Sequence, residues 1–386
     1  MNRRTFLAAL GATALASAIK AQPIFAQGQN ALLAIWTGPY GGVPAFDQIK
    51  VEMFAPSFKV AMDDYRKEIQ KIANNPEPAT FQNTIVALED SGRTYNRVSI
   101  LFGIYTSTMN TQQVQALDRE WRPKFSALSD EIVQNSKLFA RIKSVYESKA
   151  KMTPEQKRLT WVYFNQFNRS GAQLSAAQKQ QMSKVNQRLA QLYTQFSQNV
   201  LADEEQQYLI LTGPDDLKGL PQNIVDSAQA TAKSKGLAEN QYVISNTRSA
   251  MEPFLAYSAR RDLREKGWRM WTRRGDMGNA NDNNKIVKEI LKLRAEKARL
   301  LGHKTFAHWR LENTMAKDPK KAMDLMMQVW KPALARVREE VADMQALVEQ
   351  EGGTFKIEPW DYRYYAEKVR KAKYDLDESE IKPYFQ

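Results

Sequence analysis

The feature that most constrains this chain is apolar residues recurring at alternating spacings of three and four positions. An α-helix has 3.6 residues per turn, so this spacing places the apolar side chains on one helix face. One such stripe consists of Met182, Val185, Leu189, Leu192, Phe196 and Val200. A longer one consists of Met323, Met326, Trp330, Leu334, Val337, Val341, Met344 and Val348. The pattern predicts a mainly α-helical protein.

Local signals give the expected helix ends. Thr153-Pro-Glu-Gln156 and Ser175-Ala-Ala-Gln178 have the form of capping boxes, in which the first and fourth residues satisfy each other's backbone N–H groups. Asp318-Pro319 begins the last long helix, and Gly352-Gly353 ends it, because glycine adopts the left-handed C-terminal conformation without strain. Further helices are expected from Phe58 to Ile72, from Thr80 to Glu89 and from Val114 to Ser148. Pro123 and Pro332 are expected to break or kink the helices that contain them.

One stretch departs from the helical pattern. Tyr208–Thr212 and Tyr242–Ser245 are rich in β-branched and aromatic residues and are predicted as short strands. A helix from about Gln222 to Lys235 separates them. The predicted fold is therefore mainly α, with a small two-stranded β patch.

The N-terminus has the features of an export signal. Arg3-Arg4, followed by Phe6-Leu7 and an uncharged run from Thr5 to Ile19, resembles a twin-arginine signal over residues 1–26. The run is shorter than the roughly 20 residues that a membrane span needs. Residues 27–45 are then a flexible lead-in and residues 46–386 the helical portion. This division predicts a periplasmic protein with no stable membrane insertion; a buried N-terminal helix is the alternative.

Composition leaves the partner open. The formal net charge is +13, which suits nucleic acid, an anionic membrane, acidic peptides or a solvated surface without a partner. The sequence contains no cysteine, so thiol catalysis and disulfides are excluded.

The candidate catalytic and metal-binding residues do not form a recognisable site motif. The two histidines, His303 and His308, are five residues apart, and a helix would point them about 140° apart. A zinc peptidase helix needs two histidines at i and i+4 with a glutamate after the first, and Lys304 follows His303. The acid pairs Asp63-Asp64 and Glu204-Glu205 are adjacent in sequence and are interpreted as solvated.

A cluster of basic and aromatic residues could in principle bind nucleic acid, because arginines hold phosphates and aromatic rings stack on bases. The cluster comprises Arg260, Arg261, Arg264, Lys266, Trp268, Arg269, Trp271, Arg273 and Arg274. On a helix, Leu263, Trp268 and Trp271 are expected to face inward, and the arginines to face water or a carboxylate. No nucleic-acid partner is therefore predicted.

Several segments together resemble a known family. These are Asn74-Asn-Pro-Glu-Pro with the following Thr80-Phe-Gln-Asn-Thr, Leu300-Leu-Gly302 with Asn313-Thr-Met-Ala316, and Glu358-Pro-Trp-Asp-Tyr-Arg-Tyr-Tyr. Their order, from about Phe46 to Tyr384-Phe385, resembles the zinc oligopeptidases of the thimet oligopeptidase and oligopeptidase A family. The match is nearest to its bacterial peptidyl-dipeptidases, also called dipeptidyl carboxypeptidases.

This resemblance implies an N-terminal helical half of an elongated, two-part zinc oligopeptidase with a deep central channel. Such enzymes hydrolyse short peptides with a zinc-bound water, and peptidyl-dipeptidases release dipeptides from the C-terminus. The H-E-x-x-H motif that supplies the zinc ligands does not occur in these 386 residues. We therefore expect no catalytic, cofactor-binding or metal-binding residue here, no bound zinc, and a C-terminal catalytic portion as the missing partner. A non-enzymatic, exported helical peptide-binding or scaffold protein is the alternative.

A half-enzyme should also leave an apolar face uncovered. The residues expected to form that face are the aromatic side chains of the final segment: Trp360, Tyr364, Tyr365, Tyr374, Tyr384 and Phe385.

Overall fold

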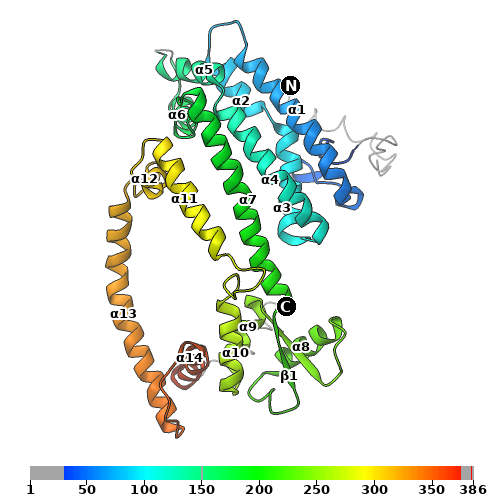
Figure 1. Ribbon diagram of the computed structural model, residues 1–386, viewed down its shortest axis with the longest axis vertical. Coiled ribbons are helices and arrows are strands. Elements are labelled where there is room, and N and C mark those ends of the chain that lie inside the picture. The colour runs from blue at the N-terminus through cyan, green and yellow to red at the C-terminus, as the bar shows by residue number, and fades with distance from the viewer. Residues whose placement is uncertain (1–29, 149–150, 375–383, 385–386) are drawn as a thin grey trace, which may run out of the picture. The chain divides into compact units, whose positions relative to one another are not determined.

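The computed structural model describes residues 30–148 and 151–374 together with Tyr384 (Figure 1). The chain divides into two compact units, residues 1–114 and residues 115–386. Most described residues are helical, and the two strands form one sheet. The prediction of a mainly α protein with a small β patch is confirmed. The predicted export signal, residues 1–26, lies outside the described residues.

The first unit is a small helical body. Its elements are η1 (Pro39–Gly41), η2 (Phe46–Gln48), η3 (Val51–Met53), α1 (Phe54–Ala73), η4 (Phe81–Val86), α2 (Ala87–Asp90) and α3 (Arg93–Thr108). The predicted helices from Phe58 and from Thr80 correspond to α1 and to η4 with α2. Phe54 and Phe58 of α1 pack against Phe102 of α3, with ring centroids 5.3 and 5.1 Å apart. These buried aromatic rings form the centre of the unit.

Part of the predicted lead-in, residues 27–45, is packed. Leu32 is fully buried, and its backbone N–H donates to Asn30 Oδ1 at 3.1 Å. Thr37 and Val43 form an isolated antiparallel bridge. Residues 30–45 therefore have local structure of their own.

The second unit contains the long helices. Its elements are α4 (Gln112–Val133), α5 (Ser136–Glu147), α6 (Pro154–Arg169), α7 (Ala176–Gln206), β1 (Tyr208–Thr212), α8 (Gln222–Ser234), β2 (Gln241–Ser245), α9 (Arg248–Tyr257), α10 (Arg261–Thr272), α11 (Asn284–Leu300), α12 (Phe306–Leu311), α13 (Pro319–Gln350) and α14 (Pro359–Tyr374). The longest are α7, with 31 residues, and α13, with 32.

The predicted helix starts are confirmed. Thr153 Oγ1 accepts the Gln156 backbone N–H at 3.2 Å, while Gln156 Oε1 accepts that of Thr153 at 3.0 Å. Ser175 and Gln178 make the same reciprocal pair at the start of α7. Asp318 caps α13 by accepting the Lys320 N–H at 2.7 Å.

The prolines do not break the helices that contain them, and the kinks expected there stay predictions. Pro123 lies inside α4 and Pro332 inside α13, and neither ends its helix. The predicted helix from Val114 to Ser148 is instead divided at Asn135, whose side chain caps α5 by accepting the Leu138 N–H. A helix interrupted by proline loses one backbone hydrogen bond, whereas a side-chain cap at Asn135 provides a new start for α5.

The β patch has the predicted strands. β1 and β2 pair antiparallel, with Ile210 opposite Val243, and α8 follows β1 and precedes β2 in the chain. The sheet packs against α8, α9 and α10. Its buried core comprises Leu211, Ala228, Ile244, Met251, Phe254, Leu255 and Leu263. This core positions α10, whose arginines Arg261 and Arg264 pair with Asp361 of α14.

Candidate functional site

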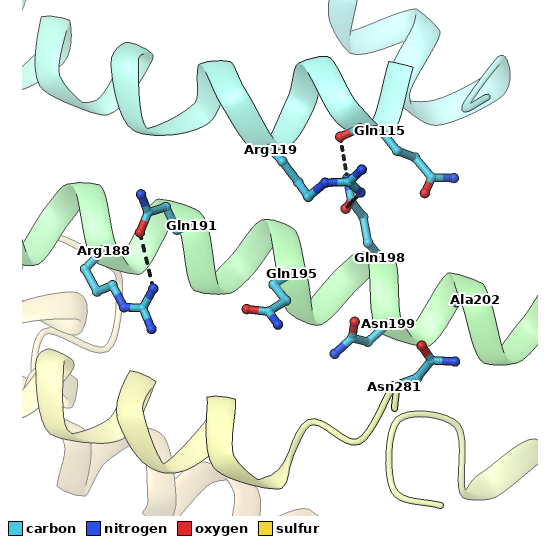
Figure 2. Close-up of a pocket in the computed structure, with 9 residues that line it drawn as sticks. All are labelled: Gln115, Arg119, Arg188, Gln191, Gln195, Gln198, Asn199, Ala202 and Asn281. Carbon is cyan, nitrogen blue, oxygen red and sulfur yellow. Dashed lines mark hydrogen bonds between the residues drawn. The ribbon is translucent and has the colours of Figure 1, made fainter. Parts of the chain in front are cut away.

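A polar groove lies between α4 and α7, next to the loop that precedes α11 (Figure 2). Its volume is about 500 Å³, within the roughly 300–1,000 Å³ of small-ligand sites. The lining residues are Gln115, Arg119, Arg188, Gln191, Gln195, Gln198, Asn199, Ala202 and Asn281. Amide side chains both donate and accept hydrogen bonds, so the groove is suited to a polar ligand such as a peptide backbone.

Two arginines of the groove are held differently. Arg188 donates two hydrogen bonds to Glu289 of α11, at 2.6 and 2.8 Å, and these bonds hold the pKa of Glu289 below its ordinary value. Arg119 donates instead to the Gln198 amide oxygen, and Gln198 donates to the Gln115 carbonyl at 3.0 Å (Figure 2). The Arg119 charge is thus held by a neutral amide and is available to an anionic ligand.

The loop before α11 is organised by one carboxylate. Asp203 of α7 is fully buried and accepts hydrogen bonds from the Gly275 N–H at 2.7 Å and from the amides of Asn279 and Asn281 at 2.9 Å each. Burial raises the pKa of Asp203, but these hydrogen bonds outweigh burial and the pKa lies below its ordinary value. The carboxylate therefore fixes Asn281 at the edge of the groove.

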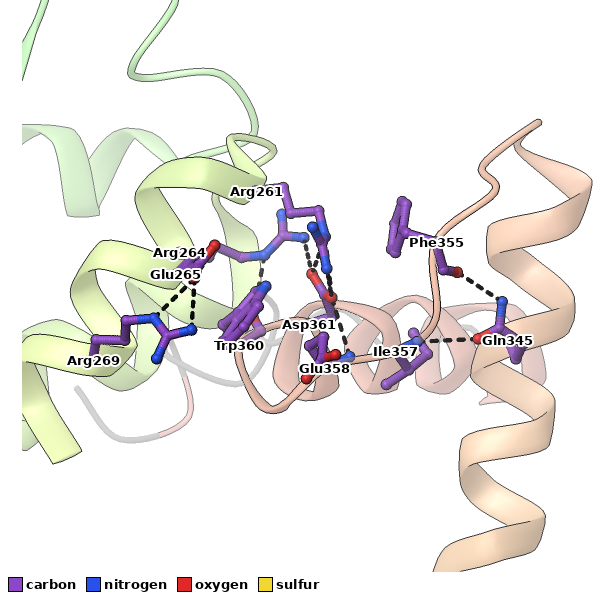
Figure 3. A network of polar contacts seen from close by, with 10 residues as sticks. All are labelled: Arg261, Arg264, Glu265, Arg269, Gln345, Phe355, Ile357, Glu358, Trp360 and Asp361. Atoms are coloured by element: carbon purple, nitrogen blue, oxygen red, sulfur yellow. Dashed lines mark hydrogen bonds and ion pairs between the residues drawn. The ribbon is translucent and has the colours of Figure 1, made fainter.

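A second polar cluster attaches α14 to α10 (Figure 3). Asp361 is fully buried and accepts hydrogen bonds from Arg261 at 2.9 to 3.1 Å and from Arg264 at 2.8 Å. The Glu358 N–H also donates to it, at 3.2 Å. Arg264 is itself almost fully buried and donates to the backbone carbonyls of Ser258 and Trp360. This cluster is structural, because its charges are paired and both Asp361 and Arg264 are buried.

The prediction of an exposed aromatic edge was wrong for Trp360, Tyr364 and Tyr365. Trp360 and Tyr365 are buried, and Tyr364 is half-buried. Trp360 packs edge-on against Trp268 with ring centroids 5.8 Å apart, because the ion pairs of Asp361 hold α14 against α10. The Tyr374 side chain and Phe385 lie outside the described residues, and Tyr384 is exposed.

The two histidines lie in separate surroundings. His303 follows the end of α11 and its Nε2 lies 3.6 Å from Glu312 Oε2. His308 lies in α12, where its Nδ1 hydrogen-bonds to the Thr305 hydroxyl at 2.8 Å.

The acid pairs have partly the predicted environment. Asp63 and Asp64 make ion pairs on the surface of α1 with the residues three positions on. Glu204, however, pairs with Arg274 in a half-buried position, so interpreting it as solvated was wrong. The sequence could not show this pair, because its members are 70 residues apart.

The basic and aromatic cluster is oriented as expected. Leu263 is buried, and Trp268 and Trp271 pack against the core of the β patch. Arg264 faces Asp361, and Arg260 faces Asp216 and Asp262. Carboxylates thus neutralise several of the arginines that could otherwise hold phosphates.

The described residues do not fit a zinc site. Over residues 30–148 and 151–374, no three or more His, Cys, Asp or Glu side chains converge as metal ligands would. Over the same ranges, no helix combines the length and apolar character required to cross a bilayer.

Comparison with known proteins defines the class. Residues 254–386 match Peptidase family M3. Over these residues the chain is similar to that family of peptidases.

Named relatives agree with that assignment. The chain is 34% identical to dipeptidyl carboxypeptidase of Escherichia coli over 92% of its own length and 52% of the relative's. It is 29% identical to oligopeptidase A of Haemophilus influenzae, over 89% of this chain and 51% of that one. The chain thus spans about half the length of the curated relatives it matches. The resemblance to the zinc oligopeptidases is confirmed, with higher identity to the dipeptidyl carboxypeptidase.

Sequence reasoning missed the groove and the buried carboxylate of Asp203. One signal could have found the loop: the run Asn279-Ala-Asn-Asp-Asn-Asn284, because clustered asparagines and aspartates bond their own backbone in turns. The amides of α7 carried no signal, since glutamine on a helix is ordinary surface.

Proposed function

We propose that this chain is the helical, peptide-contacting portion of a zinc metallopeptidase of the dipeptidyl carboxypeptidase type. The observation that carries the proposal is the 34% identity to dipeptidyl carboxypeptidase along 92% of the chain. Its substrates are short peptides, and its products are dipeptides released from the C-terminus.

In the whole enzyme, a bound zinc would lower the pKa of a water molecule and polarise the scissile carbonyl. The ligands belong to a part of the polypeptide not contained in these 386 residues, since the H-E-x-x-H motif is absent from them. The half-length coverage of the relatives supports this division. The chain by itself is then an inactive portion of the enzyme.

Within this chain, the groove between α4 and α7 is the surface best suited to a peptide. Its amide side chains can bond the backbone of an extended segment, and Arg119 can pair with a carboxylate. The groove would position substrate, while bond cleavage occurs elsewhere.

The experiment compares the 386-residue chain with a polypeptide from the same gene extended to the length of the relatives. Each is incubated with a short peptide bearing a free C-terminus and with the same peptide amidated there. We expect the extended form to release C-terminal dipeptides from the free peptide only, and a metal chelator to stop it. Internal cleavage of both peptides, or cleavage by the 386-residue chain, would contradict the proposal.

The non-enzymatic alternative has one supporting observation, the polar groove present in the chain itself. A peptide-binding or scaffold protein would bind short peptides without cleaving them in either form. Calorimetric titration of the uncleaved peptides distinguishes the two functions.

We also propose that the protein is exported to the periplasm. Support comes from Arg3-Arg4, Phe6-Leu7 and the uncharged run that follows them.

A further inference from the structure

The long apolar stripe of α13 is only partly covered. It is one continuous helix face, because its members recur at spacings of three and four. Its C-terminal end is buried: Met344 and Val348 pack with Tyr365 of α14. Figure 3 shows Gln345 of α13 bonded to the segment that leads into α14, where it donates to the Phe355 carbonyl at 3.0 Å.

The N-terminal part of the same stripe is exposed. Trp330 is 59% exposed and Met326 54%, and every residue from Met323 to Glu339 is exposed. The exposed apolar members of the stripe are Met323, Met326, Trp330, Leu334 and Val337, and the exposed Met327 lies beside them. Contiguous apolar surface of this extent is uncommon on a monomeric protein and marks an interaction site.

We propose that this exposed stripe docks an amphipathic helix from the part of the M3 polypeptide that these 386 residues do not contain. The inference rests on the proposed function, which assigns the catalytic portion to that part. Two observations favour this occupant. The stripe continues an established helix–helix interface, that of α13 with α14, and the chain spans about half of its relatives' length.

The surface also limits the chemistry of the helix. From Met323 to Val337 the stripe extends about 21 Å at 1.5 Å per residue, so a helix of about 14 residues covers it. Trp330 is the central anchor, since tryptophan dominates binding at the centre of interfaces. Three methionines give a surface that adapts to the side chains it meets.

Positive charge along one side of the stripe further restricts the sequence of the docking helix. Lys331 and Arg338 lie seven residues apart, hence about 20° apart around the helix, beside the stripe. Within residues 30–148 and 151–374, neither makes an ion pair with a carboxylate, whereas Arg336 pairs with Glu339 and Glu340. The docking helix should therefore carry acidic residues along that flank.

The absence of native cysteine allows a direct test. Single cysteines are introduced as Met326→Cys, within the stripe, and as Gln328→Cys, an exposed position on the opposite side of α13. Labelling rates with a maleimide are measured in the 386-residue chain and in the extended polypeptide. We expect similar rates at both positions in the shorter chain, and at least a tenfold slower reaction at Met326→Cys in the extended one.

Two other labelling outcomes would contradict the proposal. Equal labelling of both positions in the extended polypeptide would overturn the proposal. Slow labelling of Met326→Cys in the 386-residue chain, more pronounced at higher protein concentration, would assign the stripe to a second copy. Dipeptide release by the same extended polypeptide is assayed separately. Activity without protection refutes the docking surface alone, and protection without activity refutes the proposed function alone.

Discussion

Replacing Asp361 with asparagine should destabilise the second unit strongly. Asp361 is fully buried, and it receives hydrogen bonds of 2.8 to 3.1 Å from Arg261 and Arg264. Asp361→Asn keeps the shape of the side chain but removes its negative charge. The asparagine then offers the two guanidinium groups a single acceptor oxygen, or turns its amide N–H₂ toward them. Arg264, only 1% exposed, then remains buried without its carboxylate.

Removing one partner of a buried ion pair costs about 3–5 kcal/mol. For a unit of this size each kcal/mol shifts the melting temperature by about 2–4 °C, so the expected decrease is about 6–20 °C. The assay is thermal unfolding followed by circular dichroism, with tryptophan fluorescence as a second signal of unfolding.

The matched control is Asp343→Asn. Asp343 also joins α13 to α14, through Lys373 at 2.6 Å, but both side chains are about half exposed. Exposed pairs contribute little, so its melting temperature should stay close to that of the parent. The double variant Asp361→Asn/Arg264→Met should be more stable than Asp361→Asn alone, because it removes the unpaired charge. A melting temperature for Asp361→Asn equal to that of the control would refute this reasoning.

Three further predictions concern acid stability, a tight turn and export. The pKa of the Asp203 carboxyl lies below its ordinary value of 3.8. The stabilisation that Asp203 contributes is therefore present above pH 3.8 and is lost as the pH falls through the lower folded pKa. Asp203→Asn should flatten the loss of stability below pH 3.8 in acid unfolding curves, and an unchanged curve would contradict this. Gly219 has φ +84°, and a Cβ there would lie 2.4 Å from a backbone carbonyl oxygen, whereas a Cβ at Gly236, with φ +71°, would meet open space. In urea unfolding, Gly219→Ala should lower the stability by about 1–3 kcal/mol, and by more than Gly236→Ala does. Equal losses for the two variants would show that the close approach at Gly219 is relieved. Replacing Arg3 and Arg4 together with lysine should leave the precursor in the cytoplasm on cell fractionation, since the twin-arginine route requires the arginine pair, and export at the parent rate would assign the signal to the general secretory route.

The local features of the fold followed from sequence. The capping boxes at Thr153 and Ser175 formed as predicted because each involves residues within four positions of one another. Gly352 likewise has the left-handed conformation, φ +76°, expected just after α13. Such signals depend on the backbone of a single turn and do not need the rest of the molecule.

What covers each helix face did not follow from sequence. The spacing that identifies the stripe of α13 is the same at Met344, which is buried, and at Met326, which is exposed. Likewise, Arg264 and Asp361 are 97 residues apart, and nothing local pairs them. That pairing buries Trp360, which the sequence alone had placed at an exposed edge.

The groove was hidden for a related reason. Gln198 and Gln115 are 83 residues apart and look like ordinary surface glutamines until α4 and α7 pack side by side. The absence of an H-E-x-x-H motif, by contrast, is a property of the sequence alone.

The most direct test of the account is the zinc content of the two forms, measured by mass spectrometry after metal stripping, reloading and dialysis. We predict less than about 0.1 zinc per 386-residue chain, because its two histidines lie in separate surroundings and the described residues converge on no ligand set. The polypeptide extended to the length of the relatives should hold one zinc and release C-terminal dipeptides. One tightly held zinc in the 386-residue chain, or an extended form without zinc, would contradict the account.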